Sequence, residues 1–558
     1  MLSYTSMDEL KRRLQKLGYK GQIDTTIATR DFYSHDASMF ELMPEAVVYP
    51  QDSDDVKTLV RYVSETKKTE KRHISLTARS AGTDMTGGSI NQSILMDMTR
   101  HFNKIFEVDH AHGHAQPGVY YRDFEKETLM HDALMPSYPA SRDLCTIGGM
   151  VANNSGGEKS LQYGKVEKFV TELKVVFADG NEYTVRPLNK AELTQKMAQK
   201  DYEGNIYKQV YDLIEANYDK IKDAQPKVSK DSTAYHVWNV WDRETGIFDL
   251  NQLIIGSQGT LGIITDITFR LVKAPKHSGT LVVFLRDISQ LGNIINLVLK
   301  RKPATFEGFD NYTLMLSFKL FYYFHQTLGW WGMIKLGIQL IPDALILFKG
   351  IPKMVLLIEF NGENPEDTVA KVHQMRVDLK PFDSKESYEE DGTEAKARKF
   401  WIMRRESFNL LRKKVHDKHT APFIDDLVVP PEHLQSFLPE LRKIINDYKL
   451  LATVAGHMGD GNFHVIPLMK IEEKLERLKL LPVMQEVNAL VLKYGGSLSG
   501  EHNDGMSRGP WLHQMYSRDM MHIFKNVKSI FDPDNIFNPD KKTDAHWEFS
   551  MVHLRQHF

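Results

Sequence analysis

The chain has 558 residues but only one cysteine, Cys145. A single cysteine excludes a disulfide within the chain and an iron–sulfur cluster ligated by cysteines of this chain alone. Residues 1–21 carry charges where a signal peptide needs an apolar core, so they predict a short amphipathic helix and no export. We therefore expect a cytoplasmic protein.

An excess of charge of one sign is also missing. Lysine and arginine number 71 against 73 aspartates and glutamates, and the formal net charge is -2. Without a basic field, nucleic acid is a poor candidate for a partner. The hydrophobic fraction of 42% is typical of a globular protein, and the length suggests about two to four domains. These numbers favour a small-molecule enzyme.

Hydrophobic runs long enough to cross a membrane are absent from the most apolar region, residues 313–352. Its longest run without a charged residue, 320–334, is shorter than the roughly 20 residues that a spanning helix needs. Aromatic residues and lysines in this insertion are typical of a helix lying on a membrane surface. A buried helix pair, or a contact in a homodimer, explains the same composition equally well.

What the sequence does contain is an alternation of helical and strand patterns that predicts an α+β fold. We expect a first domain at 1–273, with a polar helical insertion at about 187–245. A second domain at 274–500 has a strand, helix, strand order that predicts a ferredoxin-like antiparallel sheet, interrupted by the apolar insertion. Residues 501–558 are expected to pack back on the first domain.

The stretch AGHMGDGNFHVIPL (455–468) predicts a hairpin, because apolar segments flank the turn signals DG and GN. His457 and His464 stand at its two feet. Residues that face each other near such a turn have Cβ atoms about 5 Å apart, which suits two ligands of one metal ion. Two ordinary hydrogen-bonded histidines are the alternative from this stretch alone.

Three glycine-rich loops, at 77–90, 139–164 and 256–265, are flanked by hydroxyl and amide side chains. Consecutive backbone N–H groups in such loops bind anions, and small side chains let a diphosphate approach. Three of them in one domain favour a large phosphate-bearing cofactor. None has the strand-to-helix GxGxxG arrangement, so we do not expect a Rossmann site.

The order of these motifs is specific. RSxGTxxTGG (79–88), PGV (117–119), TIGGMVANNSGG (146–157), FADG (177–180) and GSxGTLGIIT (256–265) strongly resemble the PCMH-type FAD-binding domain of the vanillyl-alcohol oxidase superfamily. FWIMRRESF (400–408), GHMGDGNFH (456–464), GGSLSGEHNDG (495–505) and FDPDNIFNPDK (531–541) are similar to the branch with D-lactate dehydrogenase, D-2-hydroxyglutarate dehydrogenase and the glycolate oxidase flavin subunit.

The resemblance implies FAD, held without a covalent bond because Ala81 stands where covalent relatives often carry histidine. It places these residues at the cofactor: Arg79, Ser80, Ala81, Gly82, Thr83, Thr86, Gly87, Gly88, Pro117, Gly118, Ser141, Thr146, Gly148, Gly149, Ala152, Asn153, Asn154, Gly156, Gly157, Tyr163, Gly164, Gly259, Gly262, Ile263 and Asn538.

It also implies a divalent metal, zinc or manganese, on His457, His464 and Glu501. Two imidazoles and one carboxylate leave coordination positions open for a substrate, as a catalytic metal requires. Two further residues carry roles from the family: His502 is similar to its general base, and Arg404 to the arginine that binds the substrate carboxylate, with the neighbouring Arg405 as the alternative. Asn462 adds a hydrogen bond to substrate or is only a turn residue.

Together these features predict an FAD-dependent oxidation of a D-2-hydroxy acid, such as D-lactate, with electrons passed to quinone or a separate redox protein. Three departures qualify the resemblance. Gln258 replaces a common glutamate, Asn503 replaces the glycine of GEHG, and Ile424 and Asp425 stand where the D-2-hydroxyglutarate branch has a lysine. A substrate with a distal carboxylate is therefore not expected.

Two other functions stay open at this stage. One is a transferase like alkyl-dihydroxyacetonephosphate synthase, which uses FAD without net oxidation. The other is a flavin-binding partner module without activity, although a scaffold has no need of a base beside a metal site.

Overall fold

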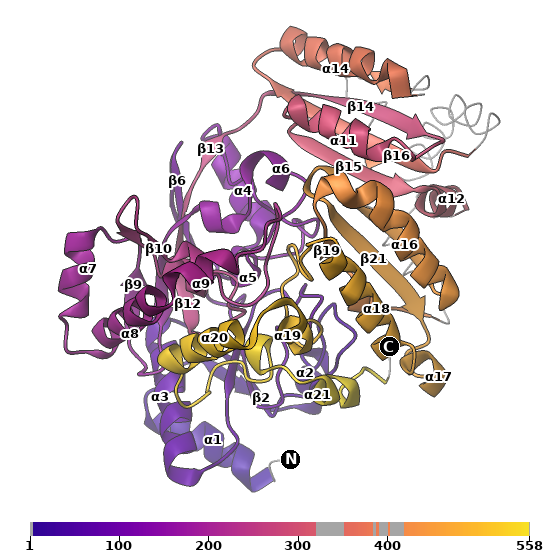
Figure 1. The fold of residues 1–558 in the computed structure, drawn as a ribbon. Helices are drawn as coiled ribbons and strands as arrows, with labels where there is room; N and C mark the ends of the chain where they lie inside the picture. Colours follow the sequence, from indigo (N-terminus) through magenta and orange to yellow (C-terminus); the bar gives the residue numbers. More distant parts are fainter. Residues whose placement is uncertain (1–3, 320–350, 383–386, 390–399, 402–417, 557–558) are drawn as a thin grey trace.

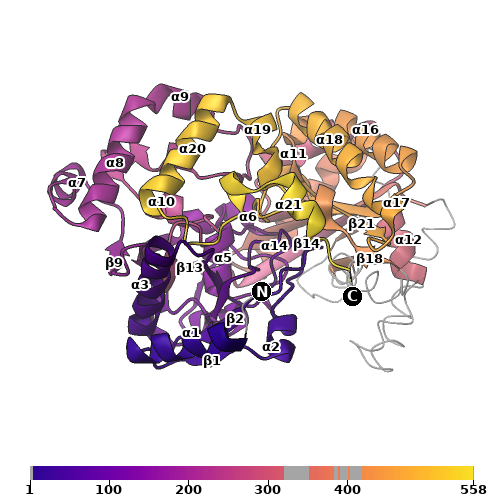
Figure 2. The same ribbon diagram turned by 90° about the horizontal axis from the view of Figure 1, so that it is seen from below.

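The structure, a computed structural model, describes residues 4–319, 351–382, 387–389, 400–401 and 418–556. It has mixed helices and sheets, which confirms the predicted α+β class. Figures 1 and 2 show the smaller sheets and their helices on one side and a large sheet with its helices on the other.

The first sheet has the strand order β1 (Gln22–Asp24), β2 (Ala46–Tyr49), β4 (Ile94–Asp97) and β3 (Leu76–Arg79). Both neighbours of β4 run parallel to it. Helices α1 (Tyr4–Lys16) and α3 (Ser53–Glu70) bury Leu14 and Val56 in the core beneath this sheet. The glycine-rich loop at 79–88 follows β3 directly.

The second sheet is antiparallel, in the order β5 (Ile105–Val108), β6 (His112–Ala115), β12 (Ile263–Arg270), β8 (Val170–Val176) and β9 (Glu182–Val185). Helix α20 (Arg518–Phe531) shares its core through Phe524 and Val527, so the C-terminal segment packs here. In the expected polar insertion, helices occupy only α7 (Lys190–Met197), α8 (Tyr202–Ala216) and α9 (Tyr218–Asp223). The chain after them turns back toward the interior.

The large sheet contains a ferredoxin-like unit, as the sequence predicts. Its chain order is β14 (His277–Leu285), α11 (Leu291–Lys300), β15 (Thr305–Asp310), β16 (Met354–Gly362), α14 (Pro365–Leu379) and β17 (Ser387–Glu389). The strands lie in the antiparallel order β17-β14-β16-β15, which is the order of that motif.

A hairpin extends this sheet beyond β15, through β20 (Leu451–His457) and β21 (Asn462–Met469). The short strands β18 (His419–Thr420) and β19 (Leu427–Val428) both pair with β21. Helix α16 (Leu434–Asp447) packs between α11 and α18 (Leu480–Lys493), α14 packs on the other side of α11, and all four contribute to one hydrophobic core.

The apolar insertion lies largely outside the described residues. Its start is α12 (Asn311–Lys319), in which Thr313 and Leu314 are buried. Within the described ranges, no helix combines the length and the apolar character required to cross a membrane. The expected membrane-surface contact of 313–352, of which 320–350 lie outside the described residues, stays a prediction.

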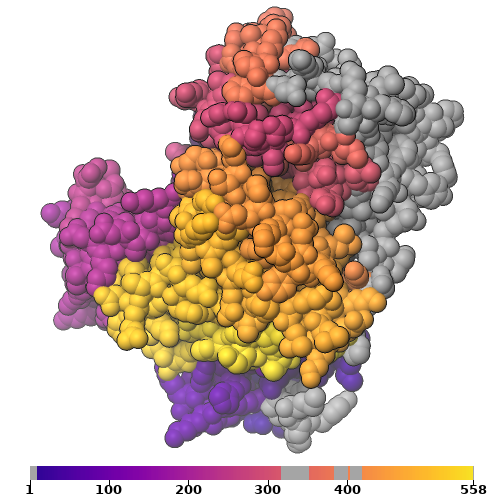
Figure 3. Space-filling view, turned by 45° about the vertical axis from the view of Figure 1, so that its right-hand side comes forward, coloured from indigo at the N-terminus to yellow at the C-terminus, as the bar shows by residue number. Residues whose placement is uncertain are grey.

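The two halves of the molecule meet at α6 (Ser160–Tyr163), which lies against β15 and the hairpin turn. Lys159 forms an ion pair with Glu359 on β16, and the Asn361 side-chain amide donates to Gln162 at 3.0 Å. Figure 3 shows the C-terminal segment, in yellow, lying against the orange residues of the large-sheet half. The division at 273 and 500 stays a prediction.

The remaining elements are short or connect these layers: α2 (Ile27–Phe32), α4 (Tyr121–Met130), β7 (Ala133–Leu134), α5 (Ile147–Asn153), β10 (Trp241–Asp242), β11 (Ile247–Phe248), α10 (Asn251–Ile254), β13 (Val272–Lys273), α17 (Lys474–Arg477), α19 (Leu512–Met515) and α21 (Trp547–Val552).

Candidate functional site

The predicted hairpin is present, but the two histidines do not face each other directly. The register pairs His457 with Asn462 and His464 with Ala455, because Met458–Asp460 form a 3-10 turn at the tip. The histidines are therefore diagonal neighbours. Gly461 closes the turn with φ of 64°, and a Cβ there would lie 1.8 Å from the Val429 carbonyl oxygen. Only glycine fits this turn.

Three potential ligand atoms converge beside the turn. The Nε2 atoms of His457 and His464 are 3.4 Å apart, and each lies 3.3 Å from Oε1 of Glu501. Ligands at tetrahedral zinc, with bonds of about 2.0–2.1 Å, are separated by about 3.3–3.4 Å. The spacing of these three atoms thus fits one divalent metal ion.

The other nitrogen of each histidine meets a carboxylate. Sheet register places Glu307 opposite His457, and Oε1 of Glu307 contacts Nδ1 of that ring. Nδ1 of His464 lies 3.3 Å from Oδ1 of Asp425. Such carboxylate–histidine pairs orient metal ligands and fix the tautomer that leaves Nε2 free. Both supporting carboxylates escaped sequence analysis, because their place depends on strand pairing.

A second set of potential ligands, Asp426, His464, Glu501 and His502, also lies within 4.8 Å. The Asp426 carboxylate, however, already accepts hydrogen bonds from the backbone N–H groups of Glu501 at 2.9 Å and His502 at 2.8 Å. It also accepts from Ser499 Oγ at 2.7 Å and from the Asn462 amide at 2.9 Å. With its lone pairs used, Asp426 shapes the loop, and His457 is the better third ligand.

His502 lies next to the three-atom cluster. Its ring stacks on His464 with centroids 5.0 Å apart and an angle of 22° between the planes. Nδ1 lies 2.9 Å from Oδ2 of Asp425, and Nε2 lies 3.9 Å from Oε1 of Glu501. Burial lowers the pKa of His502, but the charges of Asp426 and Asp425 outweigh it and raise the pKa. The two carboxylates thus stabilise the protonated imidazole, which is the form that results when His502 accepts a proton.

Lys230 is a site residue that sequence reasoning missed. Its buried Nζ lies 3.0 Å from Oε2 of Glu501 and 3.1 Å from the Gly157 carbonyl oxygen. Burial raises the pKa of Glu501, but the charge of Lys230 outweighs it, so that this pKa lies well below its usual range. The contact occupies Oε2 and leaves Oε1 toward the imidazoles. Lys230 lies in the segment assigned to a polar insertion, where no sequence pattern marks it.

The other two residues predicted to contact substrate are Arg404 and Asn462. Arg404 lies outside the described residues. Asn462 is fully buried, and its amide donates to Asp426 at 2.9 Å and to the Leu427 carbonyl oxygen at 3.3 Å. Its own oxygen lies 3.4 Å from Lys230 Nζ. These contacts tie the hairpin to β19, and the hydrogen bond from Asn462 to substrate stays a prediction.

The three glycine-rich loops converge through polar side chains. Asp84 accepts from the backbone N–H of Gly88 at 2.6 Å and from the Asn153 amide at 3.0 Å. The Gln258 amide donates to Thr86 Oγ1 at 3.1 Å and to Asn153 Oδ1 at 3.3 Å. A glutamate at 258 would have no N–H groups for these bonds, so glutamine suits this chain.

The C-terminal segment completes this cluster. The Asn538 amide donates to the carbonyl oxygens of Gly88 and Gln258, both at 2.7 Å. Asn503 has φ of 69°, a left-handed conformation that favours glycine and that asparagine tolerates. Its amide donates to the carbonyl oxygens of Asn153 at 3.1 Å and Gly256 at 2.9 Å. The metal-site loop and the cofactor loops are therefore one connected structure.

The loops fit a diphosphate cofactor. Gly259 has no neighbouring atom within 4 Å of a Cβ position and so faces open space, and a Cβ on Gly149 would make only ordinary van der Waals contacts, at 3.5 Å and beyond. Two buried cations, Arg79 and Lys541, are 7% and 2% exposed. Burial lowers the pKa of Lys541 to about 8. Positive charge with few protein partners beside glycine loops suits the phosphates of FAD.

Other glycines in this region allow two backbone segments to pack closely together. A Cβ on Gly118 would lie 2.1 Å from the Met98 carbonyl oxygen, and one on Gly157 2.0 Å from that of Tyr138. The remaining residues predicted at the cofactor lie on or beside the same loops and stay predictions: Ser80, Ala81, Gly82, Thr83, Gly87, Pro117, Ser141, Thr146, Gly148, Ala152, Asn154, Gly156, Tyr163, Gly164, Gly262 and Ile263.

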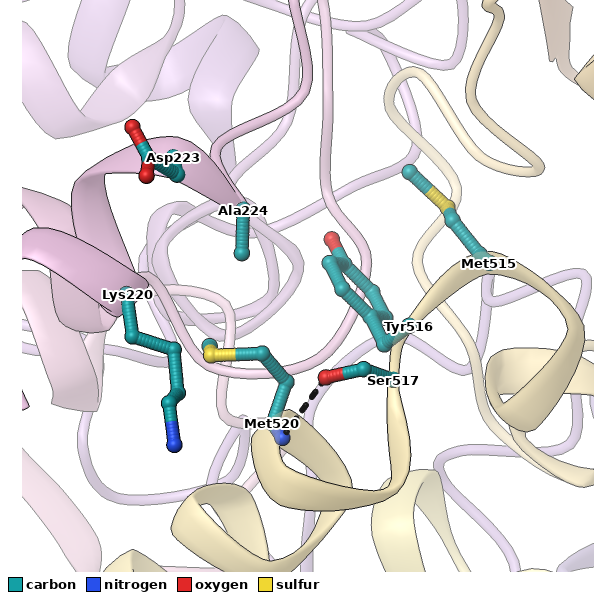
Figure 4. A pocket seen from close by; sticks show the side chains of 7 residues that line it. All are labelled: Lys220, Asp223, Ala224, Met515, Tyr516, Ser517 and Met520. Atoms are coloured by element: carbon teal, nitrogen blue, oxygen red, sulfur yellow. Dashed lines mark hydrogen bonds between the residues drawn. The ribbon is translucent and has the colours of Figure 1, made fainter.

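A surface depression of about 540 Å³ lies elsewhere, between α9 and α20. Figure 4 shows its lining, which includes Lys220, Tyr516 and Met520. The Tyr516 hydroxyl is engaged with Thr233 Oγ1 at 2.7 Å. None of the predicted site residues lines this depression, so it is separate from the histidine cluster.

Comparison with known proteins identifies two domain families in the chain. An FAD binding domain family matches residues 44–186, and the family of FAD linked oxidases, C-terminal domain, matches residues 274–542. The solved structure of p-cresol methylhydroxylase with substrate bound superposes with a TM-score of 0.66 at 12% identity, over 98% of both chains. The chain belongs to the FAD-linked oxidoreductases with a PCMH-type FAD-binding fold.

Within this class, the relatives carry names of hydroxy-acid enzymes. The chain is 28% identical over 538 residues to D-2-hydroxyglutarate dehydrogenase of Pseudomonas putida, covering 96% of this chain and 51% of the relative. It is 26% identical over 540 residues to glycolate oxidase subunit GlcD of Bacillus subtilis, covering 96% of both. The chain thus spans about half the length of the D-2-hydroxyglutarate dehydrogenase that it matches.

Proposed function

We propose that the protein oxidises a short D-2-hydroxy acid, such as D-lactate, to the 2-oxo acid with the help of a divalent metal. The observation that carries the proposal is the convergence of His457 Nε2, His464 Nε2 and Glu501 Oε1 beside the imidazole of His502. The relationship to dehydrogenases of hydroxy acids supports it. Zinc or manganese suits the His2Glu ligand set.

FAD, when bound, supplies the two-electron acceptor for the hydrogen on the α-carbon. The metal, when bound, would rest on the two histidines and Glu501 and supply a Lewis acid for the substrate oxygens. Lys230 keeps Glu501 ionised and leaves Oε1 available. These residues would therefore supply the charge and the geometry that hold a divalent metal ion.

The proton of the α-hydroxyl passes to Nε2 of His502, while the α-hydrogen leaves as hydride and the C–O bond becomes a carbonyl. The substrate loses two electrons and two hydrogens in all, and an electron acceptor, quinone or a redox protein, later takes up the electrons. Arg404 is the proposed partner of the substrate carboxylate, since a guanidinium binds carboxylate with paired N–H donors.

The substrate proposed is a monocarboxylate. Ile424 and Asp425 are 2% and 0% exposed, and the Asp425 carboxylate lies against two histidines. Neither supplies a cation for a second carboxylate.

We also propose a cytoplasmic location, with contact to a membrane through residues 313–352. Flotation of the intact protein with liposomes tests this contact, and no co-flotation would contradict it.

An anaerobic substrate panel tests the proposed function. Flavin absorbance of the purified holoprotein is followed with the D- and L-isomers of lactate, 2-hydroxybutyrate and 2-hydroxyglutarate. We expect rapid bleaching by D-lactate or D-2-hydroxybutyrate and at least about tenfold slower bleaching by their L-isomers, because the base and the metal address one face of the α-carbon. No bleaching by any member, with FAD and metal present, would contradict the oxidation and favour the transferase.

A further inference from the structure

Asp425 is a fully buried carboxylate that lies between two imidazoles with different tasks. Oδ1 is 3.3 Å from Nδ1 of His464, which belongs to the metal cluster. Oδ2 is 2.9 Å from Nδ1 of His502, the proposed base. The exposed fraction of the Asp425 side chain is 0%, so water does not compete for either oxygen.

The contact with His502 is short but is not directed as a hydrogen bond. Within the described part of the chain, neither Oδ2 of Asp425 nor Nδ1 of His502 has a hydrogen-bond partner. Because both atoms are buried and lie 2.9 Å apart, each is the nearby polar group that can satisfy the other. The geometry thus points to Nδ1 of His502 as the nitrogen that carries hydrogen toward Asp425.

The backbone holds Asp425 in place independently of the histidines. The guanidinium of buried Arg508 donates to the Asp425 carbonyl oxygen at 2.8 Å. The next residue, Asp426, has φ of 64° and accepts the backbone N–H groups of Glu501 and His502. The two adjacent carboxylates therefore have different roles. Asp426 fixes the backbone of the loop, and Asp425 faces the rings of His464 and His502.

We propose that Asp425 is a positioning residue shared by the metal site and the base, holding both imidazoles through Nδ1 so that each presents Nε2 to the reacting centre. His464 then directs Nε2 to the metal, and His502 directs Nε2 to the substrate hydroxyl. This inference rests on the proposed function and extends it, because one carboxylate couples metal affinity to the orientation of the base.

The chain offers a matched control for this role. Glu307 contacts Nδ1 of His457, which is a proposed metal ligand but not the base. Glu307→Gln and Asp425→Asn therefore make the same change, carboxylate to carboxamide, behind one ligand each. Only Asp425→Asn also removes the group behind His502.

The experiment compares wild type, D425N and E307Q as flavin-loaded proteins in two measurements. Cobalt(II) binding, followed by its visible absorption in competition with a chelator, reports metal affinity without turnover. The limiting rate of anaerobic flavin reduction by D-lactate, at saturating cobalt(II) and substrate, reports the chemical step. Both variants are expected to lose about 10–100-fold in affinity.

The two measurements separate the shared role from a role in the metal site alone. At metal saturation, D425N is expected to reduce its flavin at least about tenfold more slowly than E307Q, with little change in the substrate concentration for half-maximal rate. Equal limiting rates in D425N and E307Q, or wild-type cobalt affinity in D425N, would overturn the inference. Absence of cobalt binding in wild type would instead contradict the proposed metal site.

Should D425N fail to retain flavin, Asp425→Glu takes its place. Because D425E retains the carboxylate, we expect its limiting rate of flavin reduction to stay above about one tenth of the E307Q rate. Its longer side chain is expected to weaken cobalt binding. A rate below that limit at metal saturation, in a variant with wild-type flavin content, would contradict a role for the carboxylate behind the base.

Discussion

At the scale of single residues, Asp36 is a buried carboxyl group beside the glycine-rich loop at 77–90. Its buried carboxylate accepts from the Ser38 backbone N–H at 2.9 Å and from Ser89 Oγ at 3.0 Å. Burial and the charge of Asp84 raise the pKa of Asp36 to about 6. A carboxyl with a raised pKa in the folded state stabilises the fold at low pH and loses that contribution as pH rises through about 6.

Asp36→Asn is therefore expected to raise the thermal midpoint at pH 8, where the wild-type residue is ionised. The difference between a pKa of about 6 and the usual value for aspartate corresponds to about 3 kcal/mol of folding free energy at most. The gain in thermal midpoint should vanish toward pH 4. Thermal midpoints of the holoprotein, followed by flavin fluorescence at several pH values, measure this. The exposed Asp31 serves as control through Asp31→Asn; an equal gain at every pH would contradict the assignment.

Residue roles in the metal cluster were predictable only in part. His457, His464, Glu501 and His502 were assigned from the resemblance, and the structure brings them together. Lys230, Glu307 and Asp425 were not, because each is far along the chain from its partner and reaches it through tertiary packing. A buried lysine or carboxylate has no sequence signature of its own when its neighbour lies more than 30 residues away, as Asp425 does from His464.

At the scale of elements, the hairpin β20–β21 sets the spacing of His457 and His464, the proposed metal ligands. Its turn signals in the sequence predicted the hairpin correctly, but the 3-10 turn that makes the histidines diagonal depends on the positive φ of Gly461. The strand, helix, strand order likewise predicted the ferredoxin-like unit. The two-residue strands β18 and β19, which bring residues 425 and 426 to the site, are too short for a periodic pattern.

Gly461→Ala tests the turn. Alanine is strained in the left-handed conformation of residue 461, and its Cβ would also lie 1.8 Å from the Val429 carbonyl oxygen. We expect a loss of about 3 kcal/mol or more in stability, together with loss of bound metal. Metal content and thermal midpoint of the purified variant measure the effect.

Gly495→Ala is the matched control. Gly495 has φ of 70° but no neighbouring atom within 4 Å of its Cβ position, so alanine costs only about 1–2 kcal/mol of backbone strain. Metal content of Gly495→Ala should stay at the wild-type level. If both variants behaved alike, the close approach of Gly461 to Val429 would not be what shapes the site.

At the scale of the whole molecule, the site is assembled from segments that are distant in the chain. Asn503 joins the metal loop to the cofactor loops, and Asn538 joins the C-terminal segment to them. The glycine patterns predict the three loops, because close backbone approach needs glycine wherever the loops lie, and the contact of these loops with the cofactor stays a prediction. The contact between both halves of the protein at α6 was not predictable, since Lys159 and Glu359 are paired only by the fold.

The measurement that tests the account most directly is the metal dependence of flavin reduction. Anaerobic holoprotein is soaked with a chelator, freed of it, and mixed with the D-2-hydroxy acid that bleaches untreated protein fastest. We expect the rate to fall at least about a hundredfold while FAD stays bound, and to recover when zinc or manganese is returned, because the metal holds and polarises the hydroxyl group. An unchanged rate in protein shown to be free of metal would contradict the central claim.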